Sequence, residues 1–192
     1  MNPFKRIQYN APVTLTFTFI SFAALLILQA TDWRSLVLFS VYRAPATDPL
    51  TYVRLFGHAL GHADITHFFS NFVIILLVGP MLEEKYGGRQ LAALFAVTAF
   101  VTGLLFMLLS KPNTLLLGAS GIVFMMILLG SFTNLQKGRV PLTFILAVAV
   151  FIGREVFADA SAAENVSRAT HIAGGVCGAV FGFVINRKKI LD

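Results

Sequence analysis

The residue with the clearest potential for chemistry is Ser120, in the segment Gly118-Ala119-Ser120-Gly121, where an outward loop is expected to meet a helix. A helix amino terminus leaves backbone N–H groups unpaired and carries a positive partial charge. Such groups can bind the oxyanion that forms when a serine attacks a carbonyl carbon. The flanking glycines let backbone and substrate approach closely. Taken alone, the pattern is more often an N-cap with a packing turn, so Ser120 needs a partner.

His171 is the candidate partner, because it begins an apolar segment expected to end on the same outer side as Ser120. A histidine inside an apolar span is costly and is functional by default, although it can also be a buried histidine bonded to a backbone carbonyl. His171, Gly174 and Gly178 share one helix face, and small residues at this spacing let two membrane helices pack closely. If that face meets the helix that Ser120 begins, the imidazole can act as the general base for the serine.

His67 and Asn71 are four residues apart, at the expected outer end of another apolar helix. This spacing places both side chains on one helix face. Both can donate a hydrogen bond, so they can stabilise an oxyanion together with the backbone N–H of Ser120. The alternative is a polar pair that bonds a neighbouring helix.

A zinc site is the rival interpretation of His58, His62 and His67, because histidines at positions i and i+4 of a helix can bind zinc. The sequence has no His-Glu-x-x-His pattern, no carboxylate at ligand spacing and a single cysteine, Cys177, which we expect to be a packing residue. We therefore expect no metal and no cofactor. His58 and His62 are then predicted to fix a loop or to hold water near the serine.

Composition places these residues in a membrane protein. Of the 192 residues, 57% are hydrophobic and 12% are charged, whereas about a quarter of the residues of a soluble domain are charged. A spanning helix needs about 20 apolar residues. We predict an all-α membrane protein with one domain over residues 1–192, six transmembrane helices and a half-immersed loop between the first two. The predicted helices are about residues 11–30, 67–82, 91–110, 120–134, 141–153 and 169–186.

The distribution of basic residues predicts the orientation. With six helices, nine of the 15 Lys and Arg lie on the side of the two termini, and the side richer in Lys and Arg is cytoplasmic. The net charge of +6 comes from residues at the ends of apolar runs, which favours contact with lipid headgroups over nucleic acid. Lys5 and Arg6 before residues 11–30 also resemble a secretory signal. The length of that run and the poor cleavage site at Leu28-Gln29-Ala30 favour a retained helix.

The chain resembles the rhomboid intramembrane proteases, most closely the small bacterial members of the GlpG type. The likeness covers about residues 50–185. It is carried by three segments, Gly118-Ala119-Ser120-Gly121, His67-Phe-Phe-Ser-Asn71 and His171-Ile-Ala-Gly174-Gly-Val-Cys-Gly178. Arg54 to His62 is similar to the family's first loop, and Glu83 and Gly87 to its first cytoplasmic turn. Val53 stands where the family usually has Trp, and Thr170 replaces a common Ala before the catalytic His.

The resemblance implies a serine endopeptidase in the bacterial inner membrane that cuts transmembrane protein substrates with a Ser-His dyad and no aspartate. The implied roles are Ser120 as nucleophile, His171 as general base, and Asn71 and His67 as oxyanion donors. The residue types and spacing themselves predict supporting roles for Gly118, Gly121, His58 and His62, and helix packing for Gly174 and Gly178. Two alternatives stay open: a non-catalytic member of the fold that escorts membrane proteins, and a small transporter that uses the histidines for protons.

Overall fold

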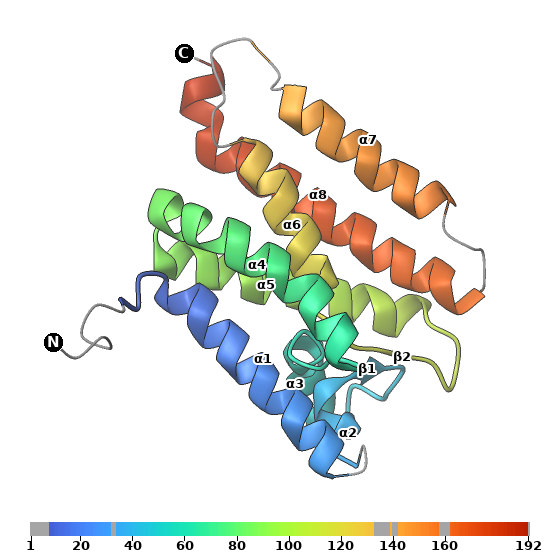
Figure 1. The fold of residues 1–192 in the computed structure, drawn as a ribbon. Helices are drawn as coiled ribbons and strands as arrows, with labels where there is room; N and C mark the ends of the chain where they lie inside the picture. The colour runs from blue at the N-terminus through green and yellow to red at the C-terminus, as the bar shows by residue number, and fades with distance from the viewer. Residues whose placement is uncertain (1–7, 32–33, 133–138, 140–141, 158–161, 192) are drawn as a thin grey trace, which may run out of the picture.

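The computed structural model describes residues 8–31, 34–132, 139, 142–157 and 162–191. Helices and two short strands follow one another along these residues (Figure 1). The helices are α1 (Pro12–Ala30), α2 (Leu36–Phe39), α3 (Pro49–Gly57), α4 (Ile65–Tyr86), α5 (Gly88–Leu109), α6 (Ser120–Ser131), α7 (Leu142–Phe157) and α8 (Ala162–Leu191). The strands β1 (Val41–Tyr42) and β2 (Leu115–Leu116) pair in antiparallel fashion, a small addition to the predicted all-α class.

Four helical segments within the described residues are long and apolar enough to cross a membrane: α1, α4, α5 and residues 167–186 of α8. The prediction of a mostly helical membrane protein is therefore confirmed. The helices α6 and α7 are shorter, with 12 and 16 residues. The count of six transmembrane helices thus stays a prediction.

Several helices extend beyond the predicted bounds. The helix α4 continues to Tyr86 instead of residue 82, α7 continues to Phe157, and α8 begins at Ala162 instead of residue 169. The predicted turn over residues 83–90 is reduced to Gly87, which has a φ of 87°. Hydropathy marks where the apolar run ends, whereas backbone hydrogen bonds carry a helix onward through polar residues until a residue such as glycine breaks it.

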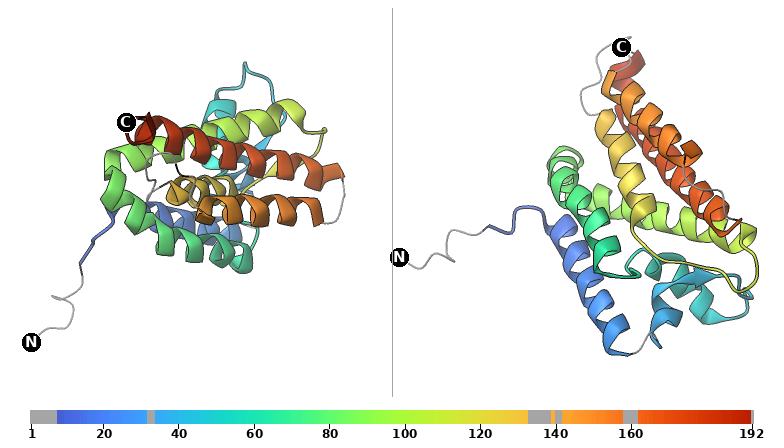
Figure 2. Two further views of the ribbon diagram at one scale, coloured as in Figure 1. Left: turned by 90° about the horizontal axis from the view of Figure 1, so that it is seen from above. Right: turned by 45° about the vertical axis from the view of Figure 1, so that its right-hand side comes forward.

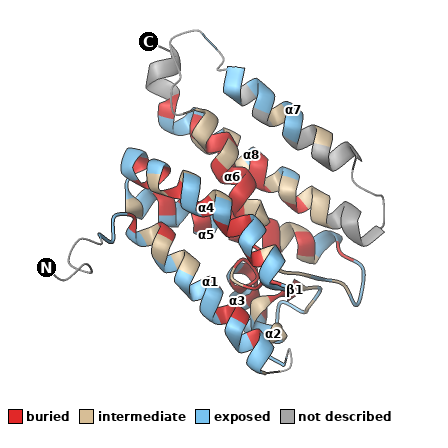
Figure 3. Ribbon diagram, in the orientation of Figure 1, coloured by how far each residue is buried: buried red, intermediate tan, exposed pale blue. Residues whose placement is uncertain are grey.

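The centre of the molecule is α6, which is surrounded by α4, α5 and α8 (Figures 1 and 2). Most of α6 is buried, whereas α1 and the described part of α7 expose much of their surface (Figure 3). Met125, Met126 and Leu129 of α6 are fully buried, with 0% exposure. A helix that is apolar all round, as α6 is, is buried either in protein or in lipid, and here the neighbouring helices cover most of it.

Glycines bring α6 and α8 into backbone contact. A Cβ atom added at Gly174 would collide with the carbonyl oxygen of Gly121, and one at Gly178 with that of Met125. No flexible side chain can move aside there, because both obstacles are backbone atoms. The predicted packing role of Gly174 and Gly178 agrees with these contacts, which fix how α8 lies along α6.

The segment between α1 and α4 is ordered around Arg54 of α3, which is 3% exposed. Its guanidinium donates hydrogen bonds to the carbonyl oxygen of Val37 at 2.8 Å and to the carboxylate of Asp48 at 2.7 Å. It also lies over the Tyr42 ring, 4.6 Å from the centroid. A buried charge that is paired in this way ties α3 to the preceding loop and to β1.

We predict that Gly178→Ala lowers the unfolding temperature, since the methyl group must push the α6 backbone away. Overpacking of this kind costs roughly 1–3 kcal/mol. Thermal unfolding in detergent micelles measures the effect. The matched control is Gly153→Ala in α7, where nothing lies within 4 Å of the added Cβ and the gain in helix propensity is the same. An unchanged or raised unfolding temperature for Gly178→Ala would contradict the packing role.

Candidate active site

Ser120 is the first residue of α6, and the preceding backbone places it there. Gly118 has a φ of 132°, a conformation that L side chains rarely adopt. A Cβ atom at Gly118 would also lie 2.8 Å from Cε1 and 2.9 Å from Nε2 of the His67 ring. Both the turn into α6 and the approach of His67 therefore require glycine at this position. The first N–H groups of α6 have no partner within the helix and are free to face a ligand.

The hydroxyl of Ser120 contacts the imidazole of His171 at the amino terminus of α6. The distance from Ser120 Oγ to His171 Nε2 is 2.8 Å, a hydrogen bond between two helices. The ring of Phe124, one turn further along α6, packs on the other side of the imidazole, with the centroids 5.0 Å apart. Gly174 lies one turn after His171 in α8, so the close helix contact sits directly beneath this pair.

His67 and Asn71 lie across a cavity of about 180 Å³ whose lining also includes Ser120 and His171. Asp64 caps α4 by accepting a hydrogen bond from the backbone N–H of His67 at 2.7 Å. Asn71 Nδ2 donates to the carbonyl oxygen of His67 at 3.0 Å. An amide nitrogen carries two protons, so one remains available to the cavity. The described lining residues include no carboxylate.

His62 contacts the backbone directly before the serine. Its Nε2 accepts a hydrogen bond from the N–H of Ala119 at 3.4 Å, and its Nδ1 lies 3.2 Å from the carbonyl oxygen of Leu60. These two partners assign the proton to Nδ1 and require a neutral ring. Burial lowers the pKa of His62 to about 4, with a smaller contribution from His67. The imidazole therefore stays neutral, and able to accept, at physiological pH.

His58 supports the same turn from the other side. Its carbonyl oxygen accepts from the N–H of Gly118 at 2.9 Å. Its Nε2 lies 3.4 Å from Thr102 Oγ1, whose own proton is used by the carbonyl oxygen of Thr98 at 2.8 Å. The His58 ring is thus the donor in that contact. Burial lowers the pKa of His58 to about 4.

The zinc interpretation does not fit these contacts. The Nε2 atoms of His58 and His62 face Thr102 and the Ala119 backbone, so they do not converge on one point. The described residues also contain no group of three or more His, Cys, Asp or Glu side chains that could hold a metal ion. Sequence reasoning missed Thr102 as a partner of His58, because a threonine in an apolar helix gives no signal of its own.

Comparison with known proteins finds several relatives and a family model that covers the segments that line the cavity. The family model described as "Rhomboid domain" matches residues 49–188. Rhomboid-related protein 1 of Caenorhabditis elegans is 32% identical over 65% of this chain and 37% of its own length. Rhomboid protease GlpG of Haemophilus influenzae is 25% identical over 71% of each chain. The chain spans about a third of the length of the first of these relatives. The matched region includes every residue that lines the cavity, and the chain belongs to the rhomboid family.

Proposed function

We propose that this protein is an intramembrane serine endopeptidase that hydrolyses peptide bonds in or near transmembrane segments of other membrane proteins. The observation that carries the proposal is the 2.8 Å hydrogen bond between Ser120 Oγ and His171 Nε2 beside a cavity. A nucleophile within hydrogen-bond reach of a base is the arrangement that acyl transfer requires. Relatives named as proteases, from Haemophilus influenzae and Toxoplasma gondii, support the same reaction.

In this mechanism Ser120 Oγ attacks the carbonyl carbon of the scissile bond while His171 Nε2 takes the hydroxyl proton. The tetrahedral intermediate collapses to an acyl-enzyme, and the imidazolium returns its proton to the leaving amine. Water then attacks the ester with His171 again as the base, which frees Ser120. Phe124 packs against the imidazole and helps to hold it in the attacking geometry.

In the proposed mechanism the oxyanion of the tetrahedral intermediate accepts hydrogen bonds from three donors. These are the backbone N–H of Ser120, the second amide proton of Asn71 and the His67 ring. The Ala63 N–H approaches His67 Nδ1 at 3.5 Å, so the proton of that ring belongs on Nε2. Donors that are fixed before the reaction stabilise the developing charge without reorganisation.

The length of α6 supports a site below the membrane surface. Its 12 residues span about 18 Å, whereas the hydrocarbon layer is about 30 Å thick. A helix of this length that reaches the far surface with its carboxyl end leaves Ser120 inside the hydrocarbon layer, near the outer leaflet. The proposed topology has six spans with both termini in the cytoplasm, the orientation that the basic residues predict. The proposed location in a bacterial inner membrane follows from the resemblance to the GlpG type.

The substrates of such a site are transmembrane segments that unwind readily. A helix hides its carbonyl groups in backbone hydrogen bonds, so cleavage needs residues such as Gly or Pro near the cut. The resemblance to the family implies a small residue before the scissile bond. The cavity of about 180 Å³ favours the same choice.

We predict that Ser120→Ala and His171→Ala abolish both cleavage of a transmembrane substrate and labelling by a fluorophosphonate probe, because each removes half of the dyad. Gel-based labelling of the purified protein measures this directly. Ser70→Ala is the matched control, since that hydroxyl also lines the cavity but is bonded to the carbonyl oxygen of His67 at 2.8 Å. Persistent labelling of Ser120→Ala at the wild-type rate would refute the assignment of the nucleophile.

Asn71→Ala should lower kcat by about 10²–10³ with a smaller effect on KM, because one oxyanion donor is lost in the transition state. Steady-state cleavage of a fluorogenic transmembrane peptide in detergent provides both constants. Probe labelling in the same variant should also slow, since the phosphonate oxygen uses the same donors. A kcat within about twofold of wild type would exclude Asn71 from the oxyanion site.

The pH dependence of stability follows from His58 and His62, whose pKa values in the folded protein are both about 4. A histidine in the unfolded chain has a pKa of about 6.5. Between about pH 6.5 and pH 4 it therefore binds a proton that the buried ring in the folded protein does not bind. The free energy of unfolding should therefore fall as the pH drops from about 6.5 to about 4, by up to roughly 3 kcal/mol for each ring. Thermal unfolding across this range tests it, and His62→Gln should flatten the dependence. An equally steep dependence in that variant would exclude His62 as its source.

A further inference from the structure

We propose that the membrane-facing furrow between α1 and α5 binds a glycerophospholipid with a zwitterionic aminoalkyl headgroup, of the phosphatidylethanolamine class. The phosphate is placed at Arg89, the ammonium group at Glu84, and one acyl chain lies along α5. The site is separate from the Ser120 cavity, with which its lining shares no residue.

Two apolar cavities form the acyl-chain part of the furrow. One of about 390 Å³ lies between the first half of α1 and the start of α5, and one of about 430 Å³ continues to α3. They adjoin because both are lined by Phe17 and Phe95. Apart from Thr16, the described lining residues are apolar or glycine. A furrow of this kind between two candidate spanning helices faces the hydrocarbon of the bilayer.

The furrow has the length of one lipid leaflet. Arg89, Ala92, Ala96 and Ala99 follow one face of α5, at intervals of three and four residues. From Arg89 to Ala99 the helix rises about 15 Å, which is half of the hydrocarbon thickness of about 30 Å. The alanines leave room for a chain against the helix, so an acyl tail in this stripe ends near the bilayer midplane.

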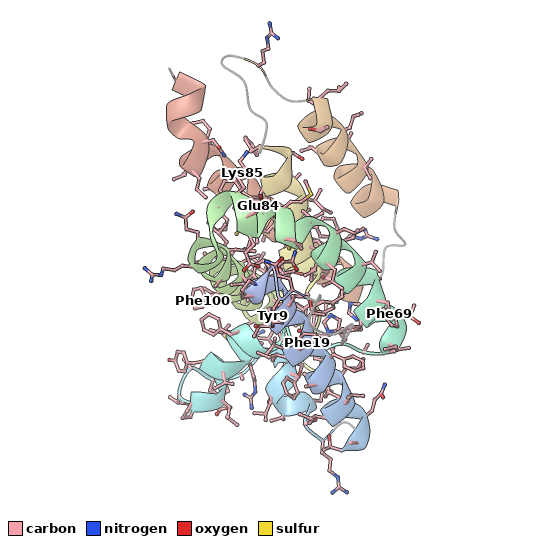
Figure 4. All side chains as sticks on the ribbon, turned by 60° about the vertical axis from the view of Figure 1, so that its left-hand side comes forward. Tyr9, Phe19, Phe69, Glu84, Lys85 and Phe100 are labelled. Carbon is pink, nitrogen blue, oxygen red and sulfur yellow. The ribbon has the colours of Figure 1, made fainter. Side chains whose placement is uncertain are left out.

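A third cavity, of about 650 Å³, provides the headgroup part. It shares Pro12 and Val13 with the apolar cavity beside α1 and is lined by Arg89 and Glu84. Both charged side chains are exposed, and the described residues show no ion pair for either of them. Glu83, which also lines this cavity, is already bonded to Val13 and Thr14. Figure 4 labels Glu84, near the end of α4, and Tyr9, three residues before the start of α1.

Opposite free charges in one cavity select a headgroup that carries both signs. A phosphate accepts hydrogen bonds from a guanidinium, and a primary ammonium donates to a carboxylate. A headgroup without an amine leaves Glu84 unpaired beside the phosphate, and a quaternary amine cannot donate to it. The charges therefore favour phosphatidylethanolamine over phosphatidylglycerol and phosphatidylcholine.

The test uses the full chain in phosphatidylcholine vesicles that contain a phosphatidylethanolamine with a diazirine in its acyl chain. Photolabelling should concentrate on peptides of α1 and α5, and unlabelled phosphatidylethanolamine should compete better than phosphatidylglycerol or phosphatidylcholine. Ala96→Trp fills the furrow and should reduce this labelling. Val97→Trp is the control, because Val97 is exposed, lies about 100° around α5 from Ala96 and lines none of the three cavities. Labelling spread evenly over the helices, or unchanged in Ala96→Trp, would overturn the site.

Two charge variants test the headgroup separately. Arg89→Gln should weaken competition by phosphatidylethanolamine about fivefold, the effect of one basic residue near a lipid phosphate. Glu84→Gln should remove the preference for phosphatidylethanolamine over phosphatidylglycerol while leaving the acyl-chain labelling in place. Arg139→Gln, another exposed arginine, should change neither. An intact preference in Glu84→Gln would refute the ammonium site, and an unchanged affinity in Arg89→Gln the phosphate site.

Discussion

The close backbone contact between α6 and α8 is the constraint on which the site depends. At Gly174 and Gly178 there is no room for even a methyl group, because the backbones of the two helices are in contact at both positions. His171 is one turn from the first of these contacts, and Ser120 begins the helix on the other side. The hydrogen bond between them is thus a result of helix packing, which holds both side chains in place.

The second half of the site depends on backbone hydrogen bonds from the segment before α4. His58 and His62 hold the turn at Gly118 and Ala119 through a carbonyl oxygen and a neutral ring nitrogen. Asp64, two residues after His62, fixes the start of α4 and with it the orientation of His67. The residues from 58 to 67 therefore position both the turn that precedes Ser120 and the start of α4, although they come from a region that no single helix organises.

Much of this site could be predicted from the sequence, because its parts carry local signals. The glycine-flanked serine, the histidine in an apolar helix and the small residues after it each indicate a role through residue type and spacing. The contacts of His62 with Ala119 and of His58 with Thr102 could not be predicted, since they join residues 57 and 44 positions apart. The helix ends were misplaced for a different reason. Hydropathy marks the residues suited to lipid, whereas backbone hydrogen bonding continues the helix through the polar residues beyond them.

The pairing of β1 with β2 has a consequence for how a short helix is tolerated in lipid. The chain from Lys111 to Ala119, which connects α5 to α6, is not helical, and with the proposed depth of Ser120 part of it lies within the lipid layer. Unsatisfied amides in hydrocarbon cost several kcal/mol each. The ladder between β1 and β2 provides backbone hydrogen bonds for Leu115 and Leu116, and the carbonyl oxygen of His58 accepts from the N–H of Gly118. The region between α1 and α4 therefore supplies hydrogen-bond partners to peptide groups in the connection between α5 and α6. These partners take the place of water, which the bilayer excludes.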